Sequence, residues 1–227
     1  MSRPAVATAL ALALVAAGAA AWAALDPDRA GLSLLLVALA LIAGGVAWFE
    51  SGPGSAKEIA VVATLGGVAA AGRVLFAAIP GVQPVTVIAM GAGAALGVRA
   101  GIAVGALAAF ASNFFLGQGI WTPWQMLAWG ACGAIGGLAA PLLRSRLAFA
   151  ALAFVLGLGF SAFMDLWEWY SFFPHTWAAL SVQFSRGLPF QLAHAVGNVI
   201  LVLVAGPELR RVLERYGRRL RTEIVWT

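Results

Sequence analysis

Long apolar runs, separated by short polar or turn-forming stretches, follow one another along most of the chain. A bilayer core accommodates a helix of roughly 20 apolar residues, and eight runs have about this character. Their approximate bounds are Ala5–Leu25, Gly31–Phe49, Glu58–Ile79, Pro84–Val98, Ala100–Leu116, Trp124–Leu143, Ala148–Met164 and Phe190–Ala205. The fourth run is short, and it meets the fifth at Gly97–Gly101 in a pattern that favours a tight hairpin. The pattern predicts an all-α integral membrane protein with about eight spans.

Composition supports this fold class. Hydrophobic residues make up 62% of the 227 residues and charged residues 10%, and the mean hydropathy is +0.93. A soluble domain has about 25% charged residues, so this chain lacks the polar side chains to cover a surface in water. Soluble enzymes, disulfide scaffolds and nucleic-acid-binding modules are therefore excluded as descriptions of the whole chain. The single cysteine, Cys132, lies in an apolar stretch and is predicted to be a packing residue.

The basic residues predict the orientation. Eleven of the 14 fall on one side of the eight-span arrangement, from Arg3 and Lys57 to the arginines of the C-terminal tail. Cytoplasmic loops are enriched in lysine and arginine, so we expect both termini in the cytoplasm and a multi-pass protein of the plasma membrane. The first run also resembles a signal peptide, with Ala21-Trp22-Ala23 as a cleavage site. It is longer than a signal core, and we expect an uncleaved helix.

The polar, turn-rich stretch Glu50–Lys57 divides the chain. Before it, residues 1–50 are predicted to form an accessory helix pair, and residues 58–207 a six-helix substrate-binding core. Residues 208–227 are predicted to form a basic amphipathic cytoplasmic tail, whose apolar stripe has helical spacing. The tail is either a solvated continuation of the last span or an interfacial helix on the cytoplasmic leaflet.

Small residues recur every four positions in several runs. Membrane helices associate through such residues because they let backbones approach closely. Internal packing is expected for most of them, including Gly93, Gly97, Gly101 and Gly105. A row in the third run has two interpretations, internal packing or a groove for another membrane subunit. That row is Ala63, Gly67 and Ala71.

Polar residues enter the membrane near the predicted outer ends of the spans. A charge within hydrocarbon costs several kcal/mol, so Arg73 is a functional candidate, although it could also extend toward the headgroups. Gln191, His194 and Asn198 share one helical face and, with Arg73, predict a polar cavity open to the outside. The candidate binding residues are Arg73, Gln83, Thr86, Asn113, Gln118, Trp121, Trp124, Gln125, Trp129, Asp165, Trp169, His194 and Asn198.

Seven of the nine tryptophans fall at the predicted outer end. An aromatic belt would account for tryptophans at both interfaces, so the bias favours an aromatic, amide-lined pocket. The long predicted loop Asp165–Pro189 would cover that pocket as a lid. Such a site suits a large planar or heterocyclic solute better than an ion.

Several chemistries are absent from the sequence. No phosphate-binding Gly-x-x-x-x-Gly-Lys-Ser/Thr loop occurs, and neither does a His-Glu-x-x-His or a Gly-x-Ser-x-Gly motif. His175 and His194 could ligate a metal or a ligand's metal, but two histidines 19 positions apart are not typical of such a site. We therefore expect no catalytic residue, no metal ligand and no permanently bound cofactor.

Three stretches carry a resemblance to a known family: Gln83-Pro84-Val85-Thr86, Ser112-Asn113-Phe114-Phe115-Leu116-Gly117-Gln118-Gly119, and Trp121-Thr122-Pro123-Trp124-Gln125-Met126 with Trp129-Gly130. They resemble the substrate-binding S component of energy-coupling factor (ECF) transporters, closest to the cobalamin-type S components. The resemblance covers about Glu58 to Pro207, and the two N-terminal helices depart from the family's six-helix pattern.

The resemblance implies a vitamin-binding membrane subunit, with cobalamin or a related corrinoid as the favoured transported ligand. It implies two kinds of partner, a transmembrane coupling subunit and two cytoplasmic ATPases that hydrolyse ATP. The row Ala63, Gly67 and Ala71 matches the family's docking face for the coupling subunit. Pantothenate, thiamin and queuosine precursors need similar amide and aromatic contacts, so the ligand stays open.

Two other functions remain alternatives. One is a membrane enzyme that uses Asp165, Glu168, His175 and Arg186 on the outer face. The other is a structural or assembly subunit that binds no ligand. Bound cobalamin, which is red, or partner genes beside this one would favour the transport function.

Overall fold

The computed structural model describes residues 17, 18, 30–50 and 56–221, and this part of the chain is helical, without strands. The prediction of an all-α protein is confirmed. Apart from residues 17 and 18, the predicted first span and the loop after it lie outside the described residues, and so does the end of the tail. The helices are α2 (Ala30–Glu50), α3 (Ala56–Leu75), α4 (Val85–Leu96), α5 (Val98–Leu116), α6 (Thr122–Leu138), α7 (Arg146–Phe172) and α8 (Trp177–Arg221), with 3-10 turns η2 (Phe76–Ala78) and η3 (Leu142–Arg144).

Among the residues that the structure describes, four helical segments are long and apolar enough to cross a membrane: Ala56–Ala78, Val98–Leu116, Arg146–Phe172 and Trp177–Gly217. Helix α4 has 12 residues, about 18 Å at 1.5 Å per residue, which is too short to span a bilayer alone. This agrees with the short fourth run in the sequence. The protein is therefore a membrane-associated helical protein.

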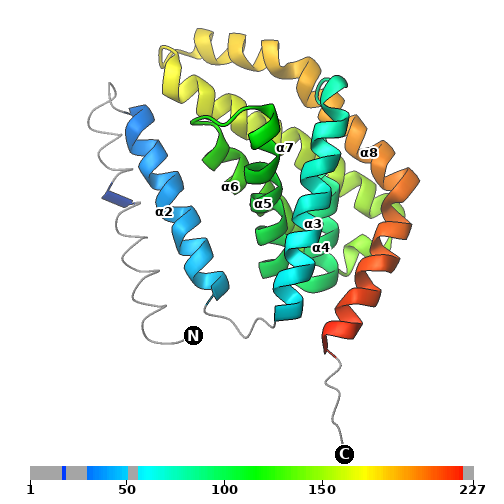
Figure 1. Cartoon of the computed structure of the whole chain (residues 1–227). Coiled ribbons are helices and arrows are strands. Elements are labelled where there is room, and N and C mark those ends of the chain that lie inside the picture. Colours follow the sequence, from blue (N-terminus) through cyan, green and yellow to red (C-terminus); the bar gives the residue numbers. More distant parts are fainter. Residues whose placement is uncertain (1–16, 19–29, 51–55, 222–227) are drawn as a thin grey trace, which may run out of the picture.

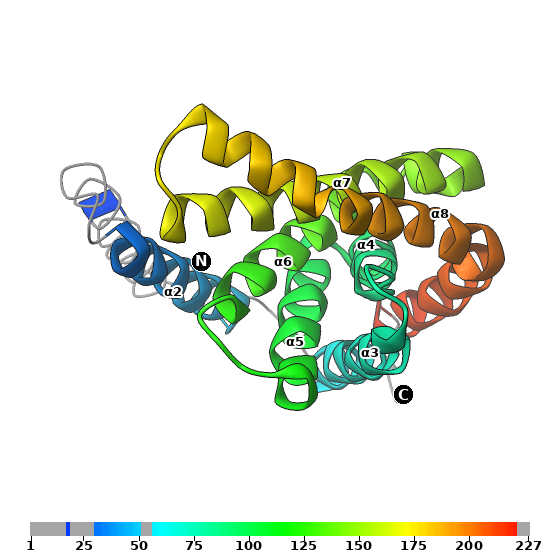
Figure 2. The same cartoon turned by 90° about the horizontal axis from the view of Figure 1, so that it is seen from above.

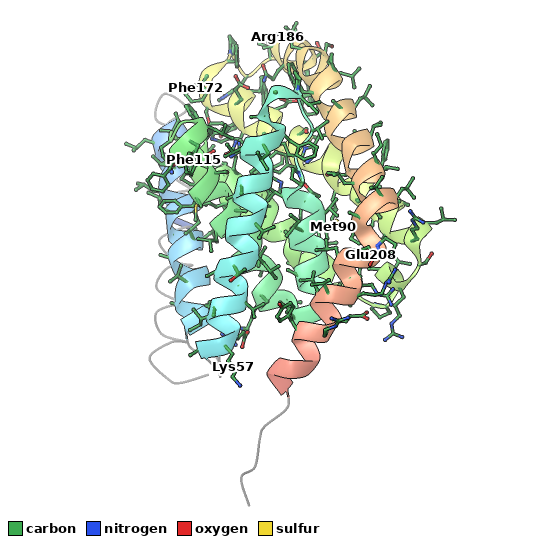
Figure 3. All side chains as sticks on the ribbon, turned by 45° about the vertical axis from the view of Figure 1, so that its right-hand side comes forward. Lys57, Met90, Phe115, Phe172, Arg186 and Glu208 are labelled. Atoms are coloured by element: carbon green, nitrogen blue, oxygen red, sulfur yellow. The ribbon has the colours of Figure 1, made fainter. Side chains whose placement is uncertain are left out.

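The helices form a bundle around α4, α5 and α6 (Figure 1). Helix α3 packs mainly on α5, and α7 and α8 run beside each other across the opposite side of the bundle (Figure 2). Helix α2 lies at the edge, where it contacts α6 and α7. Lys57 and Arg186 lie at opposite ends of the bundle (Figure 3), and these are called the Lys57 end and the Arg186 end below.

Glycines bring α4, α5 and α6 into backbone contact. A Cβ atom at Gly93 would lie 2.0 Å from the carbonyl oxygen of Gly133, and one at Gly101 would lie 2.5 Å from the same oxygen. Any side chain there would force the helices apart, so these positions require glycine. Gly97, with φ of 102°, ends α4 and starts α5, as the tight hairpin between the fourth and fifth runs predicts.

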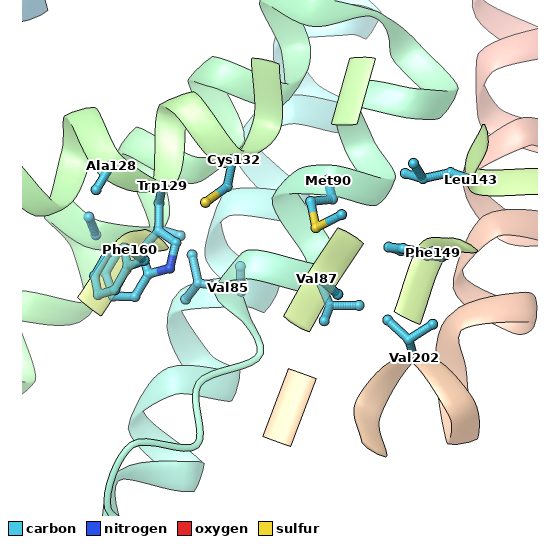
Figure 4. Packing of buried hydrophobic residues seen from close by; sticks show 14 of the residues in the cluster. Val85, Val87, Met90, Ala128, Trp129, Cys132, Leu143, Phe149, Phe160 and Val202 are labelled. Atoms are coloured by element: carbon cyan, nitrogen blue, oxygen red, sulfur yellow. The ribbon is translucent and has the colours of Figure 1, made fainter. Parts of the chain in front are cut away.

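Apolar residues of six helices fill the centre of the bundle (Figure 4). Met90 of α4 and Trp129 of α6 are fully buried, and Phe160 of α7 stacks on the Trp129 ring. Cys132 is buried among them and is not in a disulfide. The interpretation of Cys132 as a packing residue therefore agrees with its position.

The prediction of a long loop over Asp165–Pro189 is wrong. Helix α7 continues to Phe172 and α8 begins at Trp177, so only residues 173–176 connect them. The polar residues that suggested a loop instead form hydrogen bonds between α7 and α8. Gln191 donates to Asp165 at 2.5 Å, and Gln183 donates to Glu168 at 2.7 Å. Because each carboxylate is satisfied by the facing helix, the segment folds as helix instead of extending into water.

Helix α8 also continues well past the predicted end of the last span, with Pro189 and Pro207 inside it. Beyond Pro207, Leu209 and Leu213 pack over Gly91 of α4, and Leu213 is fully buried. Val212 and Tyr216, which belong to the same apolar stripe, stay about half exposed. The first part of the tail is thus a continuation of α8 that packs on the bundle.

Candidate functional site

Arg73, near the end of α3, points into the protein. Its side chain is buried, its Nε donates to Gln83 Oε1 at 2.9 Å, and its Nη1 donates to Ser112 Oγ at 2.7 Å and to Asn113 Oδ1 at 2.5 Å. The guanidinium carbon also lies 4.9 Å from the centre of the Trp129 ring, within the range of a cation–π interaction. Gln83, in the segment between η2 and α4, and residues of α5 and α6 therefore hold the arginine inside the bundle.

The charge of Arg73 has no carboxylate beside it among the residues that the structure describes. Its partners are neutral oxygen atoms and an aromatic face. Buried charges in proteins are normally paired with an opposite charge or a metal. The site therefore presents a positive charge that neutral dipoles stabilise and that an anionic or strongly accepting ligand group would complement.

Asn113 extends this network into α6. Its Nδ2 donates to Thr122 Oγ1 and to Gln125 Oε1, both at 2.8 Å. The Thr122 hydroxyl donates in turn to Gln118 Oε1 at 2.9 Å. The amide of Asn113 thus accepts from Arg73 on one side and donates to the start of α6 on the other, which fixes how α5 meets α6.

A second set of contacts lies on the other side of Trp129. The indole Nε1 donates to Thr86 Oγ1 at 3.1 Å, and the same hydroxyl lies 3.0 Å from His194 Nε2. Ser161 Oγ is 3.5 Å from the other ring nitrogen of His194. Phe160 stacks on Trp129 at 4.2 Å and meets the His194 ring edge-on at 5.1 Å. Trp129 therefore joins the Arg73 network to α4, α7 and α8.

Asn198 lies one turn of α8 beyond His194 and is fully buried. Its Nδ2 donates to the carbonyl oxygen of Ala153 at 3.3 Å, while its Oδ1 has no hydrogen-bond partner in the described part of the chain. An unsatisfied buried oxygen costs about 1–3 kcal/mol. This oxygen is available to a donor, such as water or a ligand N–H.

The Arg186 end of the bundle carries the remaining predicted residues. Trp124 is buried and stacks on Trp167, with ring centres 6.0 Å apart. Trp169 donates to the Pro174 carbonyl oxygen and Trp121 is 40% exposed, so neither joins the contacts around Arg73. Asp165 bonds to Gln191, close along α8 to His194.

Most of the predicted binding residues thus belong to one connected set of contacts, and the others lie apart from it. We call the connected contacts around Trp129 the polar cluster, which contains Arg73, Gln83, Thr86, Ser112, Asn113, Gln118, Thr122, Gln125, Trp129, Ser161 and His194. Sequence reasoning left Ser112, Thr122 and Ser161 off the candidate list. Ser112 and Thr122 lie within the stretches that carry the resemblance, whereas Ser161 sits in an apolar run without any distinctive spacing.

Of the four residues named for the alternative enzyme, Asp165 and Glu168 share α7, and each accepts a hydrogen bond from a glutamine of α8. His175 stacks on Tyr170 with ring centres 4.6 Å apart, and its Nε2 lies 2.9 Å from the Tyr170 carbonyl oxygen. Arg186 is exposed. Within the described ranges, no hydrogen bond or ion pair joins any two of Asp165, Glu168, His175 and Arg186, and no cluster of three metal-ligating side chains occurs.

The small-residue row of α3 faces outward. Ala63, Gly67 and Ala71 are exposed, and a Cβ atom at Gly67 would meet nothing within 4 Å. The adjacent Gly66 is buried instead, where a Cβ would lie 2.6 Å from Leu107 of α5. Helix α3 therefore packs on α5 through the Gly66 face and leaves the Gly67 face uncovered by the described residues.

Together these features define a membrane-associated helical protein with a buried, neutral-lined arginine. A family model described as "Family of unknown function (DUF6580)" matches residues 54–211, which is more than half of the chain. The chain belongs to this family. The matched region includes the whole polar cluster and the row on α3, and it begins after α2. No curated protein and no solved structure matches the chain.

Proposed function

We propose that the protein is the membrane-embedded solute-binding subunit of an ECF-type importer. In this proposal the chain crosses the plasma membrane about eight times, with both termini in the cytoplasm and the Arg186 end outside. It captures a vitamin or a cofactor precursor from the outside. A transmembrane coupling subunit and two cytoplasmic ATPases then drive uptake, and the chain itself hydrolyses nothing.

The observation that carries the proposal is the buried cation at Arg73. A structural arginine in a membrane protein is normally paired, because an isolated charge in hydrocarbon costs several kcal/mol. Here Gln83, Ser112 and Asn113 supply only neutral oxygen atoms. A site that binds a polar solute accounts for this arrangement, because the solute's own accepting group would complete the charge balance.

The aromatic and amide groups around Arg73 support a planar or heterocyclic solute. Trp129 and Phe160 provide stacked rings, and Gln125 and Asn113 provide amides within the same set of contacts. Cobalamin or a related corrinoid is the first ligand to test, because the sequence resembles cobalamin-type S components. The cluster's side chains bond to one another, so a solute has to replace some of these bonds when it enters.

The outward row on α3 supports the partner. Ala63, Gly67 and Ala71 are exposed, no described atom would lie within 4 Å of a Cβ at Gly67, and membrane helices dock closely on such rows of small residues. A transmembrane coupling subunit is the partner that the proposal requires at this position.

The test is direct binding to purified, full-length protein. Absorbance of the preparation would reveal co-purified cobalamin, and titrations would follow cyanocobalamin, thiamin and pantothenate. For the ligand that binds, Arg73→Gln should weaken affinity about 5- to 150-fold, since one hydrogen-bonded group contributes about 1–3 kcal/mol.

The matched control is Arg215→Gln, which also removes one positive charge but lies exposed on α8, away from the polar cluster. Its affinity should equal that of the unchanged protein. If none of the three solutes binds, or if Arg73→Gln and Arg215→Gln bind equally well, the solute-binding proposal is wrong and a structural or assembly role is favoured.

A further inference from the structure

A second group of basic residues lies outside the polar cluster, where η3 and the start of α7 meet α8. A cavity of about 340 Å³ opens there, and four arginines line it: Arg144, Arg146, Arg210 and Arg211. Glu208, which lies between the lining residues Pro207 and Arg210 in the sequence, is far from Arg186 and toward the Lys57 end (Figure 3). None of these residues belongs to the polar cluster.

The cavity has an apolar floor and a charged rim. Leu143, Phe149 and Val202 line it and are buried. Next to the rim arginines in sequence, Leu142 and Leu147 expose 53% and 76% of their surface. An apolar floor with exposed leucines at its edge is suited to a molecule that has both a charged head and a hydrocarbon chain.

The charges of the rim are only partly compensated. Arg210 pairs with Glu214 at 2.7 Å and Arg211 with Glu208 at 2.5 Å, and Arg210 also donates to the Arg144 carbonyl oxygen at 2.9 Å. In the described part of the chain, the side chains of Arg144 and Arg146 have no ion-pair partner. The rim therefore keeps a surplus of two positive charges.

We propose that this cavity binds the headgroup of an anionic phospholipid. Guanidinium groups bind phosphate oxygens through paired hydrogen bonds, and basic pockets between membrane helices accept anionic headgroups. A free phosphate ion has the same head chemistry but no use for the apolar floor. The lipid's phosphate lies between Arg144 and Arg146, and its acyl chain follows the apolar surface beside Leu147.

The experiment measures lipid binding to the full-length protein in detergent. Fluorescent phosphatidylglycerol is titrated against the unchanged protein, against Arg144→Gln/Arg146→Gln and against the control Lys57→Gln/Arg215→Gln. Both double variants lose two positive charges, but only the first changes the rim. An arginine near anionic lipid contributes about 1 kcal/mol, so the rim variant should bind about 30-fold more weakly, and the control within about twofold.

Competition measurements complete the test. Unlabelled phosphatidylcholine should compete at least tenfold less well than phosphatidylglycerol, and inorganic phosphate should not compete at millimolar concentration. Equal losses in the two double variants, or equal competition by phosphatidylcholine, would overturn the proposal. Full competition by inorganic phosphate would show a phosphate-ion site instead of a lipid site. If the rim double variant does not fold, Arg144→Gln and Arg146→Gln should each weaken binding about fivefold.

Discussion

The contact among α4, α5 and α6 leads to a prediction about Gly133. A Cβ atom at Gly133 would lie 2.1 Å from the Gly101 carbonyl oxygen, where ordinary contact begins at 3.4 Å. The atoms in the way are backbone, so the helices have to separate by more than about 1 Å. Overpacking costs about 1–3 kcal/mol, and we expect Gly133→Ala at the upper end of that range. At about 2–4 °C per kcal/mol for a chain of this size, the melting temperature should fall by about 6–12 °C.

The protein contains its own probe for this measurement. Cys132 is the chain's single cysteine and is buried beside Gly133, so a maleimide dye that fluoresces on reaction with a thiol reports unfolding. Gly159→Ala on α7 is the matched control, because a Cβ there meets nothing within 4 Å. Both changes raise helix propensity equally, so their difference isolates the clash.

A second readout connects this contact to the polar cluster. Asn113 of α5 and Gln125 of α6 share a hydrogen bond across the same helix pair, so separating the helices should also weaken solute binding. Melting temperatures of Gly133→Ala and Gly159→Ala within about 2 °C of each other would refute the close approach of these three helices.

Two further predictions concern the polar cluster and the row on α3. Thr86→Val keeps the side-chain shape but leaves the Trp129 indole N–H without its acceptor in the core. The free energy of unfolding should therefore fall by about 1–3 kcal/mol, and the melting temperature by about 2–12 °C. Thr64→Val, whose hydroxyl bonds only on an exposed face, is the control, and an equal fall in both would contradict the role of Thr86. Gly67→Leu should leave melting and solute binding unchanged but abolish co-purification of a coupling subunit, whereas Gly66→Leu should destabilise the fold because its site is filled. A Gly67→Leu protein that still captures the partner would show that docking uses another face.

Part of this architecture was readable from the sequence. The runs of apolar residues predict helices because hydrocarbon requires every backbone N–H and C=O to be bonded within its own segment. Glycines spaced by four predict close helix contacts, and the structure has them at Gly93, Gly101 and Gly133. Arg73, Asn113 and His194 stood out as candidates because polar residues in apolar runs are costly. Each of these inferences needs only a local sequence pattern and the knowledge that hydrocarbon surrounds the helices.

The segment after Asp165 shows where such patterns fail. A succession of polar and aromatic residues predicts a loop when each residue is assumed to be exposed to water. The structure instead pairs the carboxylates of Asp165 and Glu168 with the amides of Gln191 and Gln183 on the facing helix. Those partners lie 26 and 15 positions away, and no local pattern indicates that they will meet.

The polar cluster was likewise decided by tertiary structure. Arg73 and Asn113 are 40 positions apart, and Thr86 and His194 are 108 apart. Sequence composition and spacing identified polar side chains that needed partners, because an unpaired polar group in hydrocarbon is costly wherever it lies. Which groups satisfy one another depends on how the helices cross, and that is set by packing of glycine and aromatic surfaces around Trp129. A cation surrounded by neutral acceptors is a property of that packing and not of any segment alone.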